Sequence, residues 1–400
     1  MSARTIGVVT VSRSDYTIYL PILRRMAQEP ELSLHLLVTG SHLSPEFGLT
    51  AQTIEADGWS IGERISMLLS SDTPEGIAKS VGLGVLGFGQ AYGRMRPDLL
   101  VVLGDRFEMH AAALAALPFK IPVAHVHGGE LTQGAIDDAL RHSLTKLSHL
   151  HFVATQDYAR RVIQLGEEPW RVTVSGAPAL DLLRTLELLD RDALAAAYRL
   201  PLNQAPLLVT YHPVTLEYER AGWQMGELLA ALETVDRPIV FTLPSADTNG
   251  RIIIGMIEDF ASRHPDAALV STFGPQGYFS MMACAAAMVG NSSSGLIEAP
   301  SLGLPVVNIG TRQQGRVRAA NVIDVGYSRQ EISRGIAEAT APGWRERLGT
   351  LRNPYDQGGA AEVIVRRLRD VPLDDRLLQK RFADLAAPAA AEPWVSEHAG

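Results

Sequence analysis

Several features are scarce in this sequence of 400 residues. It has a single cysteine, Cys284, which excludes an internal disulfide bond. It has no hydrophobic signal at its N-terminus and no apolar run of about eighteen residues, so we expect a cytoplasmic protein that has no transmembrane helix. The GxGxxG glycines that hold a dinucleotide are also missing after the first expected strand, so no NAD or FAD is expected.

An excess of basic residues is lacking as well. The net charge is −8, from 36 basic and 44 acidic residues. Proteins that bind nucleic acid nonspecifically neutralise phosphates with a basic face, so this class of function is excluded. With 46% hydrophobic and 20% charged residues, the composition is that of an ordinary globular protein.

Short apolar runs alternate with helical patterns along most of the chain, which predicts an α/β fold with two doubly wound parallel sheets. We expect a Rossmann-like domain over residues 1–177 and a second over 178–365, with a ligand cleft between them. Among the individual elements, we expect a strand at 65–69, a helical connection at 181–200 and a helix from 375 to about 385. The segment 366–385 is a candidate to pack back on the first domain, and the Ala/Pro-rich residues 386–400 are typical of a disordered tail.

The span 98–151 carries the densest group of polar residues. The apolar run 99–103 stops at Asp105 and Arg106, and the next expected strand, 121–126, ends before His127 and Glu130. Ligands of open parallel sheets bind outside the carboxyl ends of the strands, so both groups are expected at one crevice. The stretch that follows adds three more polar residues to this region, Asp137, Arg141 and His142.

The second half has its own polar loops after expected strands. Ser292 and Ser293 lie between a strand and a helix, and Glu298 follows one turn inside. Small hydroxyl residues at a helix N-terminus favour a phosphate site, although a serine N-cap is the purely structural alternative. The loop 310–316 holds Arg312 and Arg316, whose guanidinium groups match the geometry of diphosphate oxygens.

Other interpretations of these residues stay open on the sequence alone. Asp105 could cap a helix, Asp137 could pair with Arg141 at helical spacing, and Arg13 could be a solvated loop charge instead of a phosphate ligand. The residues His125, His127, Glu130 and His142 could form a metal set. However, their spacing matches no known zinc pattern, so no metal is expected.

Eight motifs in order resemble one family, the hydrolysing UDP-N-acetylglucosamine 2-epimerases. They are SRSDY, TGSHLSPEFG, LGDRFE, HVHGGE, GAIDDALRHSLTKLSHLHF, YHPVT, GNSSSG and GTRQQGR. The resemblance implies the GT-B architecture, no metal or redox cofactor, and a homo-oligomer, either a dimer or a tetramer. It implies a UDP-sugar as the ligand, with no nucleic-acid or membrane partner. The reaction implied turns UDP-N-acetylglucosamine and water into UDP and N-acetylmannosamine, a precursor of sialic-acid-type sugars.

The resemblance also assigns the site residues. It implies catalytic roles for Asp105, His127, Glu130, Asp137 and His212. It implies substrate-binding roles for Arg13, Arg106, Arg141, His142, Ser292, Ser293, Glu298 and Arg312, of which Glu298 would hold the ribose hydroxyls. One residue departs from the family pattern: His127 stands where relatives carry a catalytic glutamate. Histidine also exchanges protons near neutral pH, so the identity of the acid and the base stays open.

Three alternatives to this function remain. The first is the same reaction on UDP-2,4-diacetamido-2,4,6-trideoxyglucose, also called UDP-diacetylbacillosamine, which supplies legionaminic-acid-type sugars. The second is a GT-B glycosyltransferase, which would pass the sugar to an acceptor. The third is a nucleotide-sugar sensor without turnover, which the density of carboxylates and histidines argues against.

Overall fold

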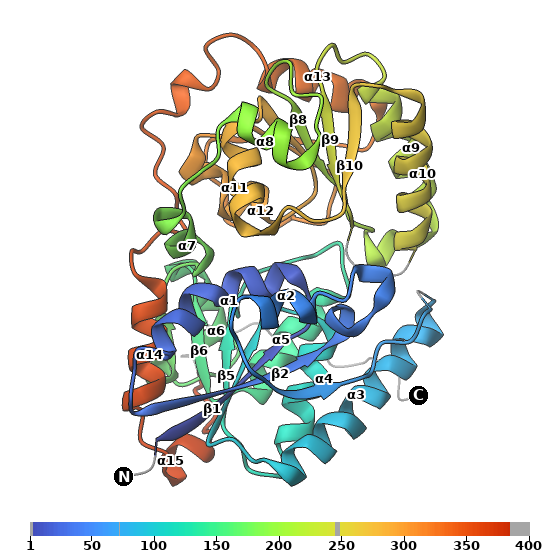
Figure 1. Ribbon diagram of the computed structural model, residues 1–400. Coiled ribbons are helices and arrows are strands. Elements are labelled where there is room, and N and C mark those ends of the chain that lie inside the picture. The colour runs from blue at the N-terminus through green and yellow to red at the C-terminus, as the bar shows by residue number, and fades with distance from the viewer. Residues whose placement is uncertain (1–2, 72, 245–248, 385–400) are drawn as a thin grey trace, which may run out of the picture.

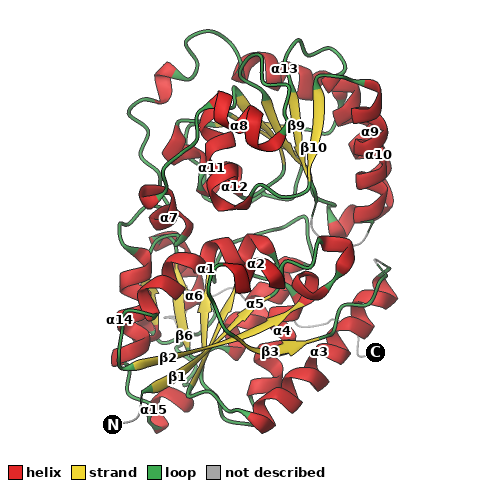
Figure 2. Ribbon diagram, viewed as in Figure 1, coloured by secondary structure: helices red, strands yellow, loops and turns green. Residues whose placement is uncertain are grey.

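A computed structural model describes residues 3–71, 73–244 and 249–384, and it contains two parallel sheets in two stacked domains (Figures 1 and 2). The first sheet has the strand order β3-β2-β1-β4-β5-β6-β7, and the second has the order β10-β9-β8-β11-β12-β13. In each sheet the chain starts at a central strand, winds to one edge and then returns to wind to the other. The expected fold of two doubly wound domains is therefore confirmed.

The elements of the first domain alternate regularly between strand and helix. They are β1 (Arg4–Thr10), α1 (Arg13–Met26), β2 (Leu32–Thr39), η1 (Gly40–Leu43), η2 (Pro45–Phe47), α2 (Ala51–Ala56), β3 (Ile61–Ile65), α3 (Pro74–Arg94), β4 (Leu99–Leu103), α4 (Phe107–Ala116), β5 (Val123–Val126), α5 (Asp137–Leu147), β6 (Leu150–Val153), α6 (Gln156–Gln164), η3 (Pro169–Arg171), β7 (Val172–Val174) and α7 (Ala179–Thr185).

The second domain and the C-terminal segment follow. Their elements are α8 (Arg191–Tyr198), β8 (Leu207–Thr210), η4 (Thr215–Arg220), α9 (Ala221–Leu232), β9 (Ile239–Thr242), α10 (Gly250–Arg263), β10 (Ala267–Val270), α11 (Gly274–Cys284), β11 (Ala287–Gly290), α12 (Ser294–Ile297), η5 (Ala299–Leu302), β12 (Val306–Ile309), β13 (Val322–Val325), α13 (Arg329–Ala339), η6 (Glu346–Leu348), α14 (Ala360–Asp370) and α15 (Asp375–Leu378).

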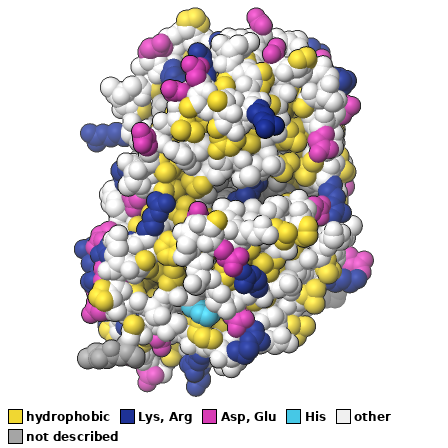
Figure 3. Space-filling view, in the orientation of Figure 1, with side chains coloured by type: hydrophobic (Ala, Val, Ile, Leu, Met, Phe, Trp, Pro, Cys, Tyr) yellow, Lys and Arg dark blue, Asp and Glu magenta, His cyan; other side chains and the backbone are white. Residues whose placement is uncertain are grey.

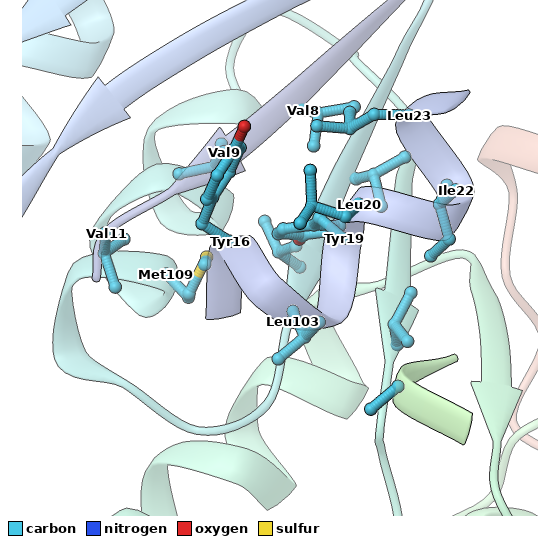
Figure 4. Packing of buried hydrophobic residues seen from close by; sticks show 14 of the residues in the cluster. Val8, Val9, Val11, Tyr16, Tyr19, Leu20, Ile22, Leu23, Leu103 and Met109 are labelled. Carbon is cyan, nitrogen blue, oxygen red and sulfur yellow. The ribbon is translucent and has the colours of Figure 1, made fainter. Parts of the chain in front are cut away.

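The core of the first domain forms where α1 covers the centre of its sheet. Tyr16, Tyr19, Leu20 and Leu23 recur at helical spacing, and all four are buried. Figure 4 shows them beside residues of β1 and the end of β4. A capping box between Ser12 and Asp15 starts this helix directly after β1, and so fixes the direction in which the chain leaves the strand.

Three expected elements differ from the structure. The strand expected at 65–69 lies at Ile61–Ile65, because this edge strand is partly exposed and carries Glu63 and Arg64, whereas 65–69 has four apolar residues out of five and gives the stronger apolar signal. The connection 181–200 contains two helices instead of one, since Asp190 accepts a hydrogen bond from the Ala193 amide (2.8 Å) and starts α8. The helix from Asp375 ends at Leu378, and the expected tail 386–400 lies outside the described residues.

The described chain ends against the first domain, where α14 lies beside α1 and α7 (Figure 1). Buried Arg171 donates hydrogen bonds to the carbonyl oxygens of Arg376 (2.7 Å) and Leu377 (2.8 Å). Next to it, Lys380 lies 2.8 Å from the fully buried carboxylate of Glu167. Lys146 and His151 also pair with Glu167, so one carboxylate joins the C-terminal segment to the sheet.

We expect Glu167→Gln to lower the free energy of unfolding by about 3 kcal/mol at pH 7, because it removes a fully buried charge that pairs with Lys380, Lys146 and His151. Burial alone would raise the pKa of Glu167, but His151, Lys380 and Lys146 together lower it to about 2. The carboxylate therefore stabilises the fold above its unfolded pKa near 4.5, and this contribution is lost as the pH falls toward 2. Urea unfolding of both proteins at pH 7 and pH 3 measures the difference, and equal stabilities at pH 7 would contradict it.

Candidate active site

Polar loops of the two domains face each other across a cleft, and Figure 3 shows the surface hollowed between the domains. In the first domain, Arg13 follows β1, Asp105 follows β4 and His127 follows β5. In the second domain, His212 follows β8, and the serine and arginine loops follow β11 and β12. These are the carboxyl ends of parallel strands in both sheets, where the sequence predicts the ligand crevice.

Glu130 lies at the centre of the first-domain cluster and is only 1% exposed. Its Oε1 atom is 2.5 Å from Nδ1 of His127. Its Oε2 atom is 3.0 Å from the Arg316 guanidinium and 3.3 Å from that of Arg141. Burial alone would raise the pKa of Glu130, but Arg316, His127 and Arg141 outweigh burial and hold that pKa far below its usual range.

His127 offers one ring nitrogen for chemistry. Its Nδ1–H donates to Glu130, whereas its Nε2 atom is buried and has no hydrogen-bond partner. The backbone at His127 has φ +63°, a left-handed conformation that is uncommon for a residue with a side chain. Because Glu130 fixes the tautomer through Nδ1, Nε2 is the atom through which His127 could accept or return a proton.

Arg141 organises the residues around this pair. It ion-pairs with Asp105 and donates to Thr132 Oγ1 (3.0 Å) and the His127 carbonyl oxygen (3.1 Å). Its side chain is 2% exposed. The resemblance implies that Arg141 binds substrate, but in the structure its guanidinium contacts protein groups, so its contribution is to position Asp105 and Glu130.

The first half of α5 brings two more expected residues, Asp137 and His142, to the site. Asp137 is the first residue of the helix and is 8% exposed. Asp138 accepts a hydrogen bond from the Thr132 amide (2.6 Å), and its other oxygen lies 3.6 Å from Nε2 of His142. Burial lowers the pKa of His142, so this ring is neutral over more of the pH range than a free histidine.

In the second domain the serine loop is braced by Asn291, which is fully buried. The Asn291 side chain accepts from the His212 amide (2.7 Å) and donates to the His212 carbonyl oxygen (2.9 Å). The Asn291 carbonyl oxygen accepts from Arg312 (3.1 Å). His212 and Arg312 are therefore fixed on either side of the loop that holds Ser292 and Ser293. An anion at this loop would meet the amides at the start of α12 and Arg312 together.

Glu298 follows α12 and is 6% exposed. Its Oε2 atom is buried without a hydrogen-bond partner. Burial raises the pKa of Glu298 to about 7, and His127 of the first domain lies close enough to counteract part of this effect. The unpaired carboxylate oxygen of Glu298 can accept hydrogen bonds from ligand hydroxyl groups.

The two remaining expected arginines hold protein groups in this structure. Arg13 donates to the Ser271 carbonyl oxygen of the second domain, and burial lowers the pKa of its guanidinium. Arg106 pairs with buried Glu108 at 3.2 Å and lies over the Phe107 ring. Both residues lie at the expected strand ends.

Thr132 is a part of the site that the sequence does not indicate, and Arg316 makes contacts that differ from those expected. The sequence suggests that Arg316 binds diphosphate together with Arg312, but in the structure Arg316 reaches the first domain instead. It contacts Glu130, the Leu131 carbonyl oxygen (2.8 Å) and Thr132 Oγ1 (3.3 Å). The contact could have been predicted only by knowing that Glu130 is buried and needs a further cationic partner from the other domain. A sequence does not show that burial.

The histidines do not gather into a metal site. His125 lies in β5 with Nε2 2.7 Å from the Gly104 carbonyl oxygen, and burial lowers its pKa to about 3. Among the described residues, no group of three or more His, Cys, Asp or Glu side chains is placed to hold a metal ion. A helix long and apolar enough to cross a membrane is likewise not found within the described part of the chain.

The domains are held together on both sides of the site. Near Asp137, the Ile136 amide donates to Thr215 Oγ1 (2.9 Å) and the Leu216 amide to the Gly134 carbonyl oxygen (3.2 Å). Farther away, the hydroxyl groups of Tyr158 and Tyr355 are 2.7 Å apart beside the second-domain loop at Val317. The structure therefore shows the two domains in direct contact, with Glu130, Asp137 and Glu298 buried.

Comparison with known proteins identifies a family for this chain. A family model described as UDP-N-acetylglucosamine 2-epimerase matches residues 24–369. A GDP/UDP-N,N′-diacetylbacillosamine 2-epimerase (hydrolyzing) from Campylobacter jejuni is 37% identical over 96% of this chain and 100% of its own. A UDP-N,N′-diacetylbacillosamine 2-epimerase (hydrolyzing) from Legionella pneumophila is 36% identical over 94% of this chain and 98% of its own. A UDP-GlcNAc 2-epimerase from Neisseria meningitidis, solved with UDP-GlcNAc, matches with a TM-score of 0.76 and 21% identity over 91% and 99% of the two chains.

The raised pKa of Glu298 predicts a dependence of stability on pH. Between about 4.5 and 7 the folded state binds a proton that the unfolded state has lost, so stability falls as the pH rises through this range. Because the amide of Glu298→Gln carries no charge, this variant should be more stable than the native chain at pH 8, by up to about 3 kcal/mol. Calorimetry at pH 5 and pH 8 tests this, and an equal difference at both values would refute it.

Proposed function

We propose that this chain, which belongs to the UDP-N-acetylglucosamine 2-epimerase family, is a hydrolysing 2-epimerase of UDP-N,N′-diacetylbacillosamine. It would convert this nucleotide sugar and water into UDP and the free 2-epimeric sugar. The main observation behind the proposal is the His127–Glu130 pair, which leaves one buried ring nitrogen of His127 without a partner at the strand ends that also carry the serine and arginine loops of the facing domain. The names of the two relatives above 35% identity support the diacetylated substrate. UDP-N-acetylglucosamine, the main expectation from sequence, becomes the second candidate.

The chemistry needs two kinds of group on opposite sides of the sugar. The hydrogen at C2 is not acidic, so its removal must accompany the departure of UDP from C1, which leaves a glycal. Water then adds across the glycal double bond, and a proton returns to the opposite face of C2. The site must therefore stabilise a leaving diphosphate and supply at least two groups that transfer protons.

We assign the diphosphate to the second domain. Ser292, Ser293 and Arg312 surround the start of α12, where backbone amides and a guanidinium can meet developing negative charge. Glu298 has a buried oxygen without a partner in the same region and would accept hydrogen bonds from the ribose hydroxyls. His212 is fixed beside this loop by Asn291 and would act near the bond between the sugar and the diphosphate.

We assign the proton transfers to the first domain. His127 would use Nε2, with Glu130 holding its other nitrogen. Asp137, at the N-terminus of α5, and Asp105, held by Arg141, are the carboxylates available for the second transfer. Groups on two different elements can approach C2 from opposite faces, as inversion at this carbon requires.

The test is to incubate the enzyme in D₂O with EDTA, separately with the UDP-diacetylated sugar, its GDP counterpart and UDP-N-acetylglucosamine. We expect free sugar and nucleoside diphosphate, with deuterium at C2 of a manno-configured product, and the highest kcat/KM on the UDP-diacetylated sugar. A gluco-configured product that keeps its C2 hydrogen would refute the epimerase, and a higher kcat/KM on UDP-N-acetylglucosamine would refute the substrate. Turnover that requires an added acceptor would instead identify a glycosyltransferase.

The same assay tests the carboxylates. Asp105→Asn and Asp137→Asn keep the side-chain shape but remove the exchangeable carboxylate, so kcat should fall by about two orders of magnitude or more. UDP affinity, measured by calorimetry, should stay within about threefold. Asp259→Asn changes an exposed aspartate on α10 and serves as the control with native activity. Native turnover in either site variant would remove that residue from the mechanism.

We also propose that two copies of the chain associate through the outer face of α3 and α4. Leu83, Leu86, Leu114 and Leu117 are 39 to 66% exposed there, on helices that lie side by side (Figure 2). From residue 82 to 93, α3 has no charged side chain, and a Cβ atom added at its outward glycines would meet nothing within 4 Å. An uncharged face with small residues fits a second, identical face about a two-fold axis.

Light scattering after size-exclusion chromatography tests this association. We expect the native chain to be a dimer or tetramer, and the double variant Leu83→Glu/Leu86→Glu to have about half its mass or less, because burying carboxylates against an apolar face is unfavourable. Ile252→Glu, at a 48% exposed position on α10, should keep the native mass. The proposal is wrong if the double variant keeps the native mass.

A further inference from the structure

Arg316 brings a cation of the second domain into the centre of the first-domain cluster. It lies in the loop between β12 and β13, and its side chain is 6% exposed. All three of its contacts named above are with first-domain residues, Glu130, Leu131 and Thr132. Its guanidinium therefore reaches across the cleft and contacts protein groups of the first domain.

The contacts of Glu130 divide between the domains. Its Oε1 faces His127, and its Oε2 is shared by Arg141 and Arg316. Arg141 comes from the same domain as Glu130, but Arg316 does not. Because both arginines hold Oε2, Oε1 is left to receive the Nδ1–H of His127 in a fixed orientation.

The cleft has to open for a nucleotide sugar to enter. Glu130, Asp137 and Glu298 are between 1% and 8% exposed. When the domains separate, Arg316 leaves Glu130, the Leu131 carbonyl oxygen and Thr132 together. The open enzyme would then hold Glu130 with Arg141 alone on Oε2, and a buried carboxylate with fewer cationic partners orients its other neighbours less firmly.

We propose that Arg316 is a positioning residue that latches the closed domains and completes the His127–Glu130 pair only on closure. The enzyme thereby restricts proton transfer to the state in which the site is shut off from bulk solvent, so that only a water molecule bound with the sugar can react. This inference rests on the proposed function, since it assigns a step of the same reaction. A phosphate-binding role for Arg316 would give a different result, because substitution of Arg316 would then weaken nucleotide binding.

Two substitutions and a matched control test the proposal. Arg316→Met removes the cation and its donors, and Arg316→Lys keeps a charge near Glu130 but loses the fork onto Leu131 and Thr132. We expect Arg316→Met to lower kcat by about 100-fold and Arg316→Lys by about 10-fold, with KM and the Kd for UDP within about threefold of native. Arg251→Met breaks an exposed ion pair with Glu46 that also crosses between the domains, and it should lower kcat by less than about threefold.

Outcomes that overturn the proposal are equally specific. Native kcat in Arg316→Met would overturn it, and so would a loss of UDP affinity as large as the loss of kcat, which would identify a phosphate ligand. An effect of Arg251→Met on kcat as large as that of Arg316→Met would also overturn it. The loss of any ion pair between the domains would then lower kcat, and the contact with Glu130 would have no special role. If Arg316→Met does not fold, Arg316→Lys decides the question alone by the same criteria.

A second readout does not need turnover. Spin labels at exposed Gln52 and Glu258, in a Cys284→Ser background, report the distance between α2 and α10. With UDP bound, we expect one short distance in the native sequence and a broader, longer distribution in Arg316→Met. Identical distributions would refute the latch. Because this measurement uses UDP alone, it separates failure of the latch from failure of the proposed reaction.

Discussion

A carboxylate that is 1% exposed stays ionised only if charged partners replace the water it has lost, and Glu130 obtains these partners from both halves of the molecule. Arg141 comes from α5, His127 from the loop after β5, and Arg316 from the loop after β12. The orientation of the His127 ring, the position of Asp105 through Arg141 and the closed arrangement of the domains all depend on this one buried charge. The geometry of the candidate site and the contact between the domains are thus linked by an electrostatic requirement.

The sequence predicts the location of the site well because the rule behind the prediction is topological. Asp105, His127 and Ser292 each follow an apolar run that forms a strand. In each of the two sheets, parallel strands place their carboxyl ends on the same side. The sequence does not show which charged side chains will form ion pairs with each other. Arg141 and Arg316 were expected to meet a ligand or diphosphate, yet both are used on Glu130, since the cost of burying that carboxylate appears only in three dimensions.

Element boundaries failed where exposure is intermediate. The edge strand β3 exposes alternate residues, so the more apolar run after it gave a stronger but misleading signal. Capping by Asp190 divided one expected helix into two. The substrate expectation was also limited: the motifs identify the reaction type, while the choice between one acetamido group and two depends on contacts around C4 of the sugar that no motif describes. The names of the two relatives supplied the preference for the diacetylated sugar.

The return of α14 and α15 to the first domain has a consequence for biosynthesis. The N-terminal part of the chain leaves the ribosome first. The elements β1 to α7 therefore emerge long before α14, the helix that packs on α1 and α7. Until residues 360–380 are made, the first domain lacks the lysine that pairs with Glu167 and the backbone carbonyls that receive Arg171. The second domain can fold as soon as it has emerged, whereas the first becomes complete only after residues 360–380 have been made.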